Sequence, residues 1–272
     1  MATIINVALE FKKEVNDLFN KKNNNWIAMF IGKTGSGKSY SALDIADAFS
    51  NRGFIIKHHL IFNVMQFFEV LNDPVGIKKG DILIFDEAGV GISSRDWQSL
   101  ANKLIGSTLQ TFRRMNIGLL YTTPSMAMLD KQARTLIDHI FEPVSIDRIN
   151  NLCYCKVHEY QYNDSMDKFY RKRLTFNDET GYPVHMNGMN IQMPRKELVE
   201  EYEARKKQYT TELNKRSLEE LKDTDSKKKK EPKPMCGKCK GFRIEYTKTT
   251  KEWWCKTCGW TTKKEPAFSS PP

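Results

Sequence analysis

The stretch that decides the fold is residues 26–39, which read WIAMFIGKTGSGKS. Six apolar residues come first, and an apolar run of this length that ends at a glycine is typical of a buried strand. Residues 39–50 follow the glycine-rich part, and their apolar side chains recur at helical spacing. The sequence therefore predicts a strand, a glycine-rich turn and a helix in succession.

The glycine-rich turn fits the pattern G-x-x-x-x-G-K-[ST], whose backbone N–H groups cradle phosphates when a strand precedes it and a helix follows. Lys38 is placed to reach the β- and γ-phosphates of a nucleotide, and the Ser39 hydroxyl is a candidate Mg²⁺ ligand. The alternative is a chance glycine-rich turn, against which the flanking strand and helix count. The predicted nucleotide-binding residues here are Gly32, Lys33, Thr34, Gly35, Ser36, Gly37, Lys38, Ser39 and Tyr40.

A second candidate element is residues 81–87, which read DILIFDE. Four apolar residues predict a central strand, and Asp86 and Glu87 then lie at its carboxyl end, where ligands bind in open α/β sheets. We expect Asp86 to hold Mg²⁺ through water and Glu87 to polarise an attacking water as a general base. The alternative is a strand that ends in solvated acids. Asp86 follows Lys38 by 48 residues, with one strand and one helix between. Glu87 favours an ATPase over a small-molecule kinase, because an ATPase needs a glutamate that activates water and such a kinase does not.

A third apolar run, residues 117–123, ends in two threonines, and Thr122 or Thr123 could orient the water or sense the γ-phosphate; Thr123 is the candidate catalytic residue. Further strands are expected over residues 54–62 and 139–146, and helices over residues 64–71, 94–115 and 126–137. Residues 152–162 and 168–176 predict an antiparallel hairpin after a parallel core. The fold class predicted for this part of the chain is α/β.

The order of these motifs resembles that of the additional-strand, catalytic-glutamate P-loop ATPases, and within them the FtsK–HerA superfamily with its viral packaging and zonular occludens toxin-like branch. The match covers residues 25–145, and Pro124 stands where family members usually carry glutamine. The resemblance implies a RecA-like fold with a mostly parallel sheet, ATP and Mg²⁺ as cofactors, and a hexameric ring in which a neighbour's arginine completes each site. Arg113 and Arg114 are the leading candidates, and Arg134 and Arg95 are alternatives; each could instead be a surface or phosphate-contacting arginine.

Four of the six cysteines, at positions 236, 239, 255 and 258, form a C-x₂-C…C-x₂-C pattern with 15 residues between the pairs. This spacing is typical of a zinc site, so Cys236, Cys239, Cys255 and Cys258 are the predicted ligands of a small zinc ribbon. Disulfides are the alternative, and no secretory signal supports them. Aromatic residues and lysines between and around the cysteines suit nucleic-acid contact or the docking of a protein.

Charge is distributed unevenly along the 272 residues. The net charge is +10, and the segment from Asp223 onward holds 13 Lys and Arg against 6 Asp and Glu. A basic tail favours an acidic partner such as DNA, and a solvated linker is the alternative. The longest apolar runs are about 6 residues, whereas a membrane span needs about 20, so we expect no membrane association and a cytoplasmic protein, in the host cytoplasm if viral.

The expected domain organisation has five parts: an ATPase domain over residues 1–194, a helical extension over 195–222, a basic flexible linker over 223–234, the zinc ribbon over 235–264 and a tail over 265–272. The expected function is an ATP-hydrolysing motor that translocates or packages DNA, from a virus or mobile element. Expected partners are DNA, further copies of the chain in a ring, and a capsid or terminase-like protein. The alternative is a nucleotide-gated adaptor that docks protein or nucleic acid through the ribbon.

Overall fold

The computed structural model describes residues 7–73, 76–86, 115–129, 131–177, 180–230 and 234–267. Two compact units divide the chain, Met1–Tyr209 and Thr210–Pro272, and each is described by itself. Glu87, Arg95, Arg113 and Arg114 lie outside the described residues, as does most of the helix predicted over residues 94–115.

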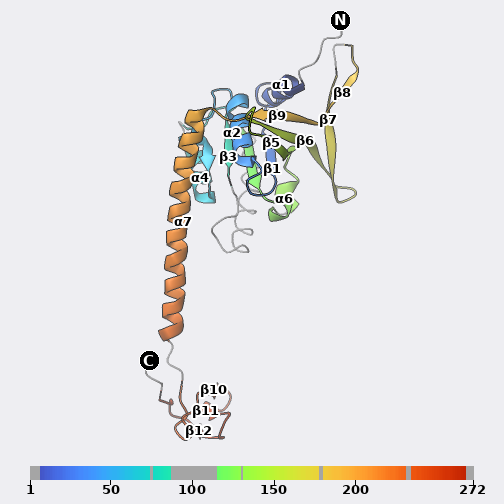
Figure 1. Cartoon of the computed structure of the whole chain (residues 1–272). Helices are drawn as coiled ribbons and strands as arrows, with labels where there is room; N and C mark the ends of the chain where they lie inside the picture. Colours follow the sequence, from blue (N-terminus) through green and yellow to red (C-terminus); the bar gives the residue numbers. More distant parts are fainter. Residues whose placement is uncertain are drawn as a thin grey trace. The chain divides into compact units, whose positions relative to one another are not determined.

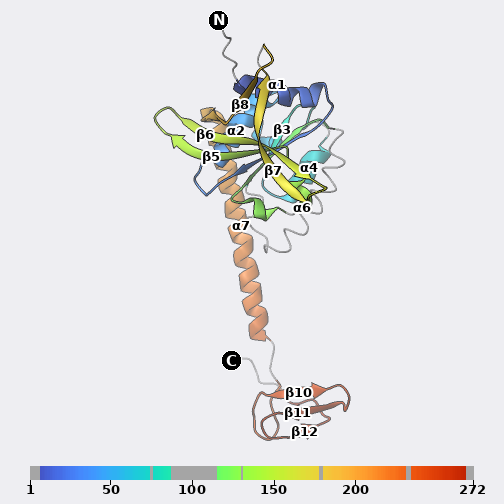
Figure 2. The ribbon, with the colours of Figure 1, turned by 90° about the vertical axis from the view of Figure 1, so that its right-hand side faces the viewer.

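The first unit is built on a mixed sheet whose central strands are parallel (Figures 1 and 2). Their order is β2 (Leu60–Ile61), β3 (Ile82–Phe85), β4 (Gly118–Thr123), β1 (Trp26–Ile31) and β5 (His139–Asp147), with every neighbouring pair parallel. Strand β4 therefore lies between the strand that precedes the glycine-rich turn and the strand that precedes Asp86. This arrangement confirms the predicted α/β fold class with a mainly parallel central sheet.

An antiparallel extension follows β5 in the same sheet. It consists of β6 (Leu152–Asn163), β7 (Lys168–Asn177), β8 (Pro183–Met186) and β9 (Gly188–Gln192). Strand β6 pairs with β5, β7 and β9, and β7 pairs with β8. The hairpin predicted over residues 152–176 is therefore confirmed, and it extends the sheet beyond the parallel core.

Each face of the sheet is covered by helices and carries its own apolar core. On one face, α1 (Val7–Asn20), α2 (Lys38–Phe49) and the first turns of α7 (Lys196–Lys230) pack through buried side chains that include Phe11, Phe49 and Tyr202. On the other face, α4 (Val64–Asn72) and α6 (Lys131–Arg134) cover a core that includes Phe67 and Ala133. Burial of these aromatic and aliphatic side chains is the main force that holds the layers together.

The segment predicted as a strand over residues 54–62 differs from that prediction. It contains the one-turn helix α3 (Ile56–His59) and only the two-residue strand β2. The fully buried His59 explains the difference, because its Nδ1 accepts a hydrogen bond from the Ile55 N–H at 3.1 Å and so turns the chain locally.

Two predicted helices also have different bounds. Residues 126–137 hold the 3-10 helix η1 (Met126–Met128) and α6, which are separated at Leu129, where the backbone is extended. Helix α7 continues to Lys230, eight residues into the segment predicted as a linker. No glycine or proline occurs between Arg195 and Lys230, so nothing in the backbone chemistry ends the helix before Pro232.

The second unit holds a three-stranded antiparallel sheet of β10 (Ile244–Thr247), β11 (Glu252–Cys255) and β12 (Thr261–Thr262). Its core is small: Cys236, Ile244 and Cys255 are buried, and Trp253 and Trp260 pack against them. Among the described residues of the whole chain, no helix is both long enough and apolar enough to cross a membrane.

Candidate functional site

The glycine-rich turn connects the end of β1 to the start of α2, as predicted. Gly35 and Gly37 have φ angles of 77° and 92°, in the left-handed region that side chains other than glycine rarely adopt. Gly37 is also the N-cap of α2, and as a glycine it supplies no side-chain cap to the first N–H groups of the helix. The first N–H groups of a helix and its positive dipole end favour an anion, so the local chemistry is that of a phosphate site.

Two side chains of the turn also suit a phosphate site. The Lys38 side chain is largely buried, and its Nζ donates a hydrogen bond of 2.8 Å to the Lys33 carbonyl oxygen across the turn. The Ser36 Oγ is buried and has no hydrogen-bond partner among the residues that the structure describes. An unsatisfied buried hydroxyl costs about 1–3 kcal/mol, and a phosphate oxygen in the turn would satisfy it.

Asp86 lies directly after β3 and is 1% exposed, and the turn reaches it through Ser39. The Ser39 Oγ donates a 2.8 Å hydrogen bond to Asp86 Oδ1, and the Thr122 Oγ1 at the end of β4 donates a second one of 2.7 Å to the same oxygen. Serine hydroxyl and carboxylate oxygens are the ligand types that Mg²⁺ prefers. The structure therefore brings together the two segments that were predicted to share one magnesium ion.

The other oxygen of Asp86 is bound by helix α7. The Tyr202 hydroxyl donates a 2.7 Å hydrogen bond to Oδ2, and Lys206 Nζ lies 3.2 Å from the same oxygen and 2.9 Å from the tyrosine oxygen. Burial and the neighbouring carboxylate raise the pKa of Tyr202, so its hydroxyl keeps its proton and remains a donor. Sequence reasoning missed both residues as members of the site.

A cavity of about 590 Å³ opens beside the turn and α2. Its walls also include the β5–β6 turn, the end of β9 and one side of α7, and Tyr40, Cys153, Gln192, Tyr202 and Lys206 line it. Cavities of this size hold small ligands. Tyr40, which was predicted to bind the nucleotide, lies here and donates a 2.9 Å hydrogen bond to Glu203.

A pair of thiols on β6 lies close to the glycine-rich turn. The Sγ atoms of Cys153 and Cys155 are 3.8 Å apart, and that hydrogen bond lowers the pKa of Cys153. The Cys153 Sγ also lies 3.2 Å from the point where a Cβ on Gly37 would be, so this glycine has little room for a side chain. From the residues alone, these two cysteines were interpreted only as core or surface thiols.

The structure describes some of the candidate catalytic residues and not others. Thr123 lies at the end of β4, but its hydroxyl donates to the Ser125 carbonyl oxygen at 3.1 Å, and its neighbour Thr122 is the threonine that reaches Asp86. Glu87, Arg113 and Arg114 lie outside the described residues, so their roles stay predictions. The alternative Arg134 lies over the ring of Phe169, 5.4 Å from its centroid.

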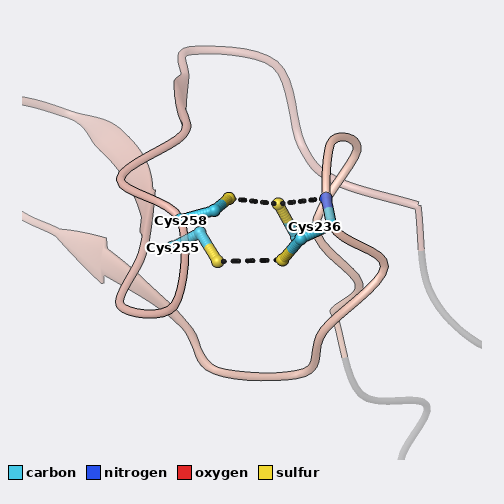
Figure 3. A group of neighbouring side chains, drawn as sticks. Cys236, Cys255 and Cys258 are labelled. Atoms are coloured by element: carbon cyan, nitrogen blue, oxygen red, sulfur yellow. Dashed lines mark hydrogen bonds between the residues drawn. The ribbon is translucent and has the colours of Figure 1, made fainter.

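The second candidate site is the cysteine cluster of the second unit. Figure 3 shows two tight loops that direct their sulfur atoms toward one another. The Sγ atoms are 3.6 Å apart in the pairs Cys236–Cys258 and Cys239–Cys255, and all four lie within 4.8 Å of one another. A tetrahedral zinc ion with Zn–S bonds of about 2.3 Å requires sulfur atoms about 3.8 Å apart, so the four thiols fit this metal.

Comparisons with protein families, curated proteins and solved structures differ in their outcome. No protein-family model and no curated protein matches the chain. Among solved structures, it is similar to the crystal structure of the N-terminal domain of zonular occludens toxin from Neisseria meningitidis, with 17% sequence identity and a TM-score of 0.34. The match covers 56% of this chain and 95% of that domain.

Proposed function

We propose that the chain is a Mg²⁺-dependent ATPase whose glycine-rich turn and Asp86 act on one bound triphosphate. The hydrogen bond from Ser39 to Asp86 is the observation that supports this most directly, since it joins the phosphate-binding turn to the strand-end carboxylate. The orphaned Ser36 hydroxyl and the adjoining cavity support the same proposal.

Each residue has a role in this proposal. The N–H groups of residues 33–39 and the Lys38 ammonium bind the β- and γ-phosphates. Ser39 ligates the Mg²⁺, and Asp86 accepts hydrogen bonds from its water shell; the ion neutralises the charge that develops on the phosphates. Glu87, the next residue in the chain, orients a water and accepts its proton. The nucleoside part occupies the cavity beside Tyr40 and Cys153.

The proposed use of this hydrolysis is to move or package DNA. The net charge of +10 and the basic C-terminal part suit a polyanionic partner. In this proposal copies of the chain form a ring, Arg113 or Arg114 of one copy stabilises the transition state in the next, and a capsid or terminase-like protein is a further partner. The four clustered cysteines hold a structural Zn²⁺, which supplies folding energy to a unit too small for a large core.

Hydrolysis of ATP by the full chain, with and without duplex DNA, tests the proposal. We expect Mg²⁺-dependent turnover that DNA stimulates, and a loss of about 100-fold or more in Lys38→Ala and in Glu87→Gln, because loss of a general base costs about 10²–10⁴ in rate. Glu69→Gln, which changes an exposed acid on α4, is the matched control and should retain the wild-type rate. Equal rates in Glu87→Gln and Glu69→Gln would refute the proposed hydrolysis.

A nucleotide-gated adaptor is the second candidate, and the contacts of α7 favour it. The helix that places Tyr202 and Lys206 on Asp86 continues without a break to Lys230, and the cysteine cluster follows it in the chain. A nucleotide that changes the bonding of Asp86 would thus act on the helix that leads to the second unit. Size-exclusion chromatography with ATP separates the two candidates: a ring in the presence of ATP supports the motor, and a persistent monomer with slow turnover supports the adaptor.

A further inference from the structure

The antiparallel extension carries basic side chains that the nucleotide site does not use. Strand β7 contains the sequence KFYRKR at residues 168–173. Side chains alternate between the two faces of a strand, so Arg171 and Arg173 share one face, and Lys168 and Lys172 point to the opposite one. All four are exposed. The strand therefore presents two cations on each face, which can be compared directly.

The register with β6 shows that the two faces differ in charge. Arg171 lies opposite Tyr160, and Arg173 lies opposite His158. Lys156 lies two residues before His158 on β6 and so shares this face. We call Lys156, His158, Arg171 and Arg173 the basic face. On the other side of the sheet, Lys172 lies opposite the carboxylate of Glu159, which reduces the positive charge there.

One acid lies among the cations of the basic face. Glu142 on β5 is the cross-strand partner of Lys156, and its Oε1 accepts a 2.5 Å hydrogen bond from Arg171. The described residues place no carboxylate within ion-pair distance of Arg173 or Lys156. Three permanent cations therefore share a surface with a single carboxylate, and a net positive charge remains.

His158 lies in the field of the same charges. Partial burial is the largest influence and lowers its pKa, the Glu142 carboxylate raises it, and the charges of Arg171, Lys156 and Arg173 each lower it. The three cations thus act together at this point of the sheet. An anion bound here would be attracted by all of them.

The geometry favours contact with a row of phosphates over stacking with bases. Arg171 and Arg173 lie two residues apart on a strand, about 6.6–6.8 Å along its axis, and each guanidinium can bind a phosphate with two N–H groups. Two aromatic rings of the same hairpin already carry a cation, since Lys131 lies over Tyr162 and Arg134 lies over Phe169. Exposed cations in a row suit a sugar–phosphate backbone read without regard to sequence.

We infer that the basic face of β6 and β7 is a binding surface for the phosphodiester backbone of nucleic acid. The inference deepens the proposed DNA-dependent function and rests on it only for the class of the partner. It assigns the contact to a surface of the first unit, separate in sequence from the basic C-terminal part. The sheet order places this surface toward the β8 end of the sheet, beyond the parallel strands that carry the nucleotide site (Figure 1).

Salt-dependent binding of the full chain to a fluorescent 30-base-pair duplex, without nucleotide, tests this inference. The test variant is Arg171→Gln with Arg173→Gln, and the matched control is Lys168→Gln with Lys172→Gln, which has the same net charge. Each phosphate contact contributes about 0.9 to the slope of log K against log salt, so the test variant should lose about 1.8 from the slope. At 0.1 M salt it should bind about 60-fold more weakly than the wild type, and the control should change little.

The remaining outcomes overturn the inference. An equal loss of slope in both double variants would mean that net charge alone matters and that no face is selected. If anionic vesicles or polyglutamate bind equally well, and this binding also depends on Arg171 and Arg173, the surface attracts any polyanion and does not select nucleic acid. A test variant that changes its sedimentation in the absence of DNA would identify an interface between copies of the chain. The binding assay contains no nucleotide. If the chain lacks ATPase activity but shows the predicted difference in slope, only the proposed hydrolysis is refuted and the inference stands.

Discussion

The hydroxyl of Tyr202 ties α7 to the nucleotide site, and the change Tyr202→Phe isolates its contribution. The phenylalanine keeps the buried ring and its edge contact with Tyr40, whose ring centroid is 6.0 Å away, and it removes only the oxygen. That oxygen donates to the fully buried carboxylate of Asp86 at 2.7 Å. A hydrogen bond to a charged group contributes about 1.5–3 kcal/mol to stability.

The expected cost lies in the lower half of that range. Lys206 Nζ remains 3.2 Å from Asp86 Oδ2, so the carboxylate does not become an unpaired buried charge. We therefore expect the free energy of unfolding of the first unit to fall by about 1.5–2 kcal/mol, which corresponds to roughly 10- to 30-fold faster exchange of amides that open only by global unfolding.

Hydrogen exchange of peptides from β1 and β3, followed by mass spectrometry, measures this change. The control is Tyr209→Phe on the same helix, because the Tyr209 hydroxyl donates a long 3.4 Å hydrogen bond to a neutral acceptor, the carbonyl oxygen of Phe62. Its exchange rates should rise less than about 3-fold, since a weak bond to a neutral acceptor contributes about 0.5 kcal/mol. Equal rates in the two variants would refute the argument that the charged bond to Asp86 fixes α7.

Three further predictions follow from other groups. Lys206→Met removes the cation beside Asp86, with which Mg²⁺ would otherwise compete. Binding of Mg²⁺ should gain about 1 kcal/mol, so the Mg²⁺ concentration that half-saturates activity should fall about 5-fold. A higher half-saturating concentration would contradict the competition between Lys206 and the metal. Burial raises the pKa of Asp138 to about 6, above its unfolded value, so its ionisation destabilises the fold above pH 6 and this cost disappears as the pH falls toward 3.8. Asp138→Asn, whose amide oxygen can still accept the Ile27 N–H, should therefore raise the urea midpoint at pH 8 and give no gain at pH 4, and a gain that is the same at both values would exclude this cause. Removal of Zn²⁺ by a chelator should abolish amide protection in β10 and β11 and leave β1 unchanged, and unchanged protection in β10 after the metal has been removed would contradict a metal-dependent fold.

The sequence predicted those parts of the fold that local chemistry determines. The turn at residues 32–39 requires glycine at positive φ and lysine and serine at set distances from it, and the apolar strand before it follows from composition alone. The convergence of this turn with Asp86 was predictable too, because parallel strands bring their carboxyl ends to one edge of the sheet. Thr122 and Thr123 show the limit of sequence analysis: both end the same strand, and only the folded structure shows that Thr122 is the one that faces Asp86.

The rest of the site depends on contacts between distant parts of the chain. Tyr202 falls within the predicted helical extension over residues 195–222, but its contact with Asp86 spans 116 residues of sequence, and no pattern indicates where that helix docks. The strand expected over residues 54–62 was wrong for a related reason, because the buried contacts of His59 override the apolar composition. Cys153 became part of the cavity wall only through the pairing of β6 with β5.

The measurement that tests the central claim most directly is the binding of a fluorescent ATP analogue to the wild type and to Asp86→Asn, each with and without Mg²⁺. If the glycine-rich turn and Asp86 share one metal–nucleotide complex, Mg²⁺ should strengthen binding to the wild type, and Asp86→Asn should lose that gain while it keeps the Mg²⁺-free affinity. An identical gain from Mg²⁺ in both proteins would contradict the claim and remove Asp86 from the metal site.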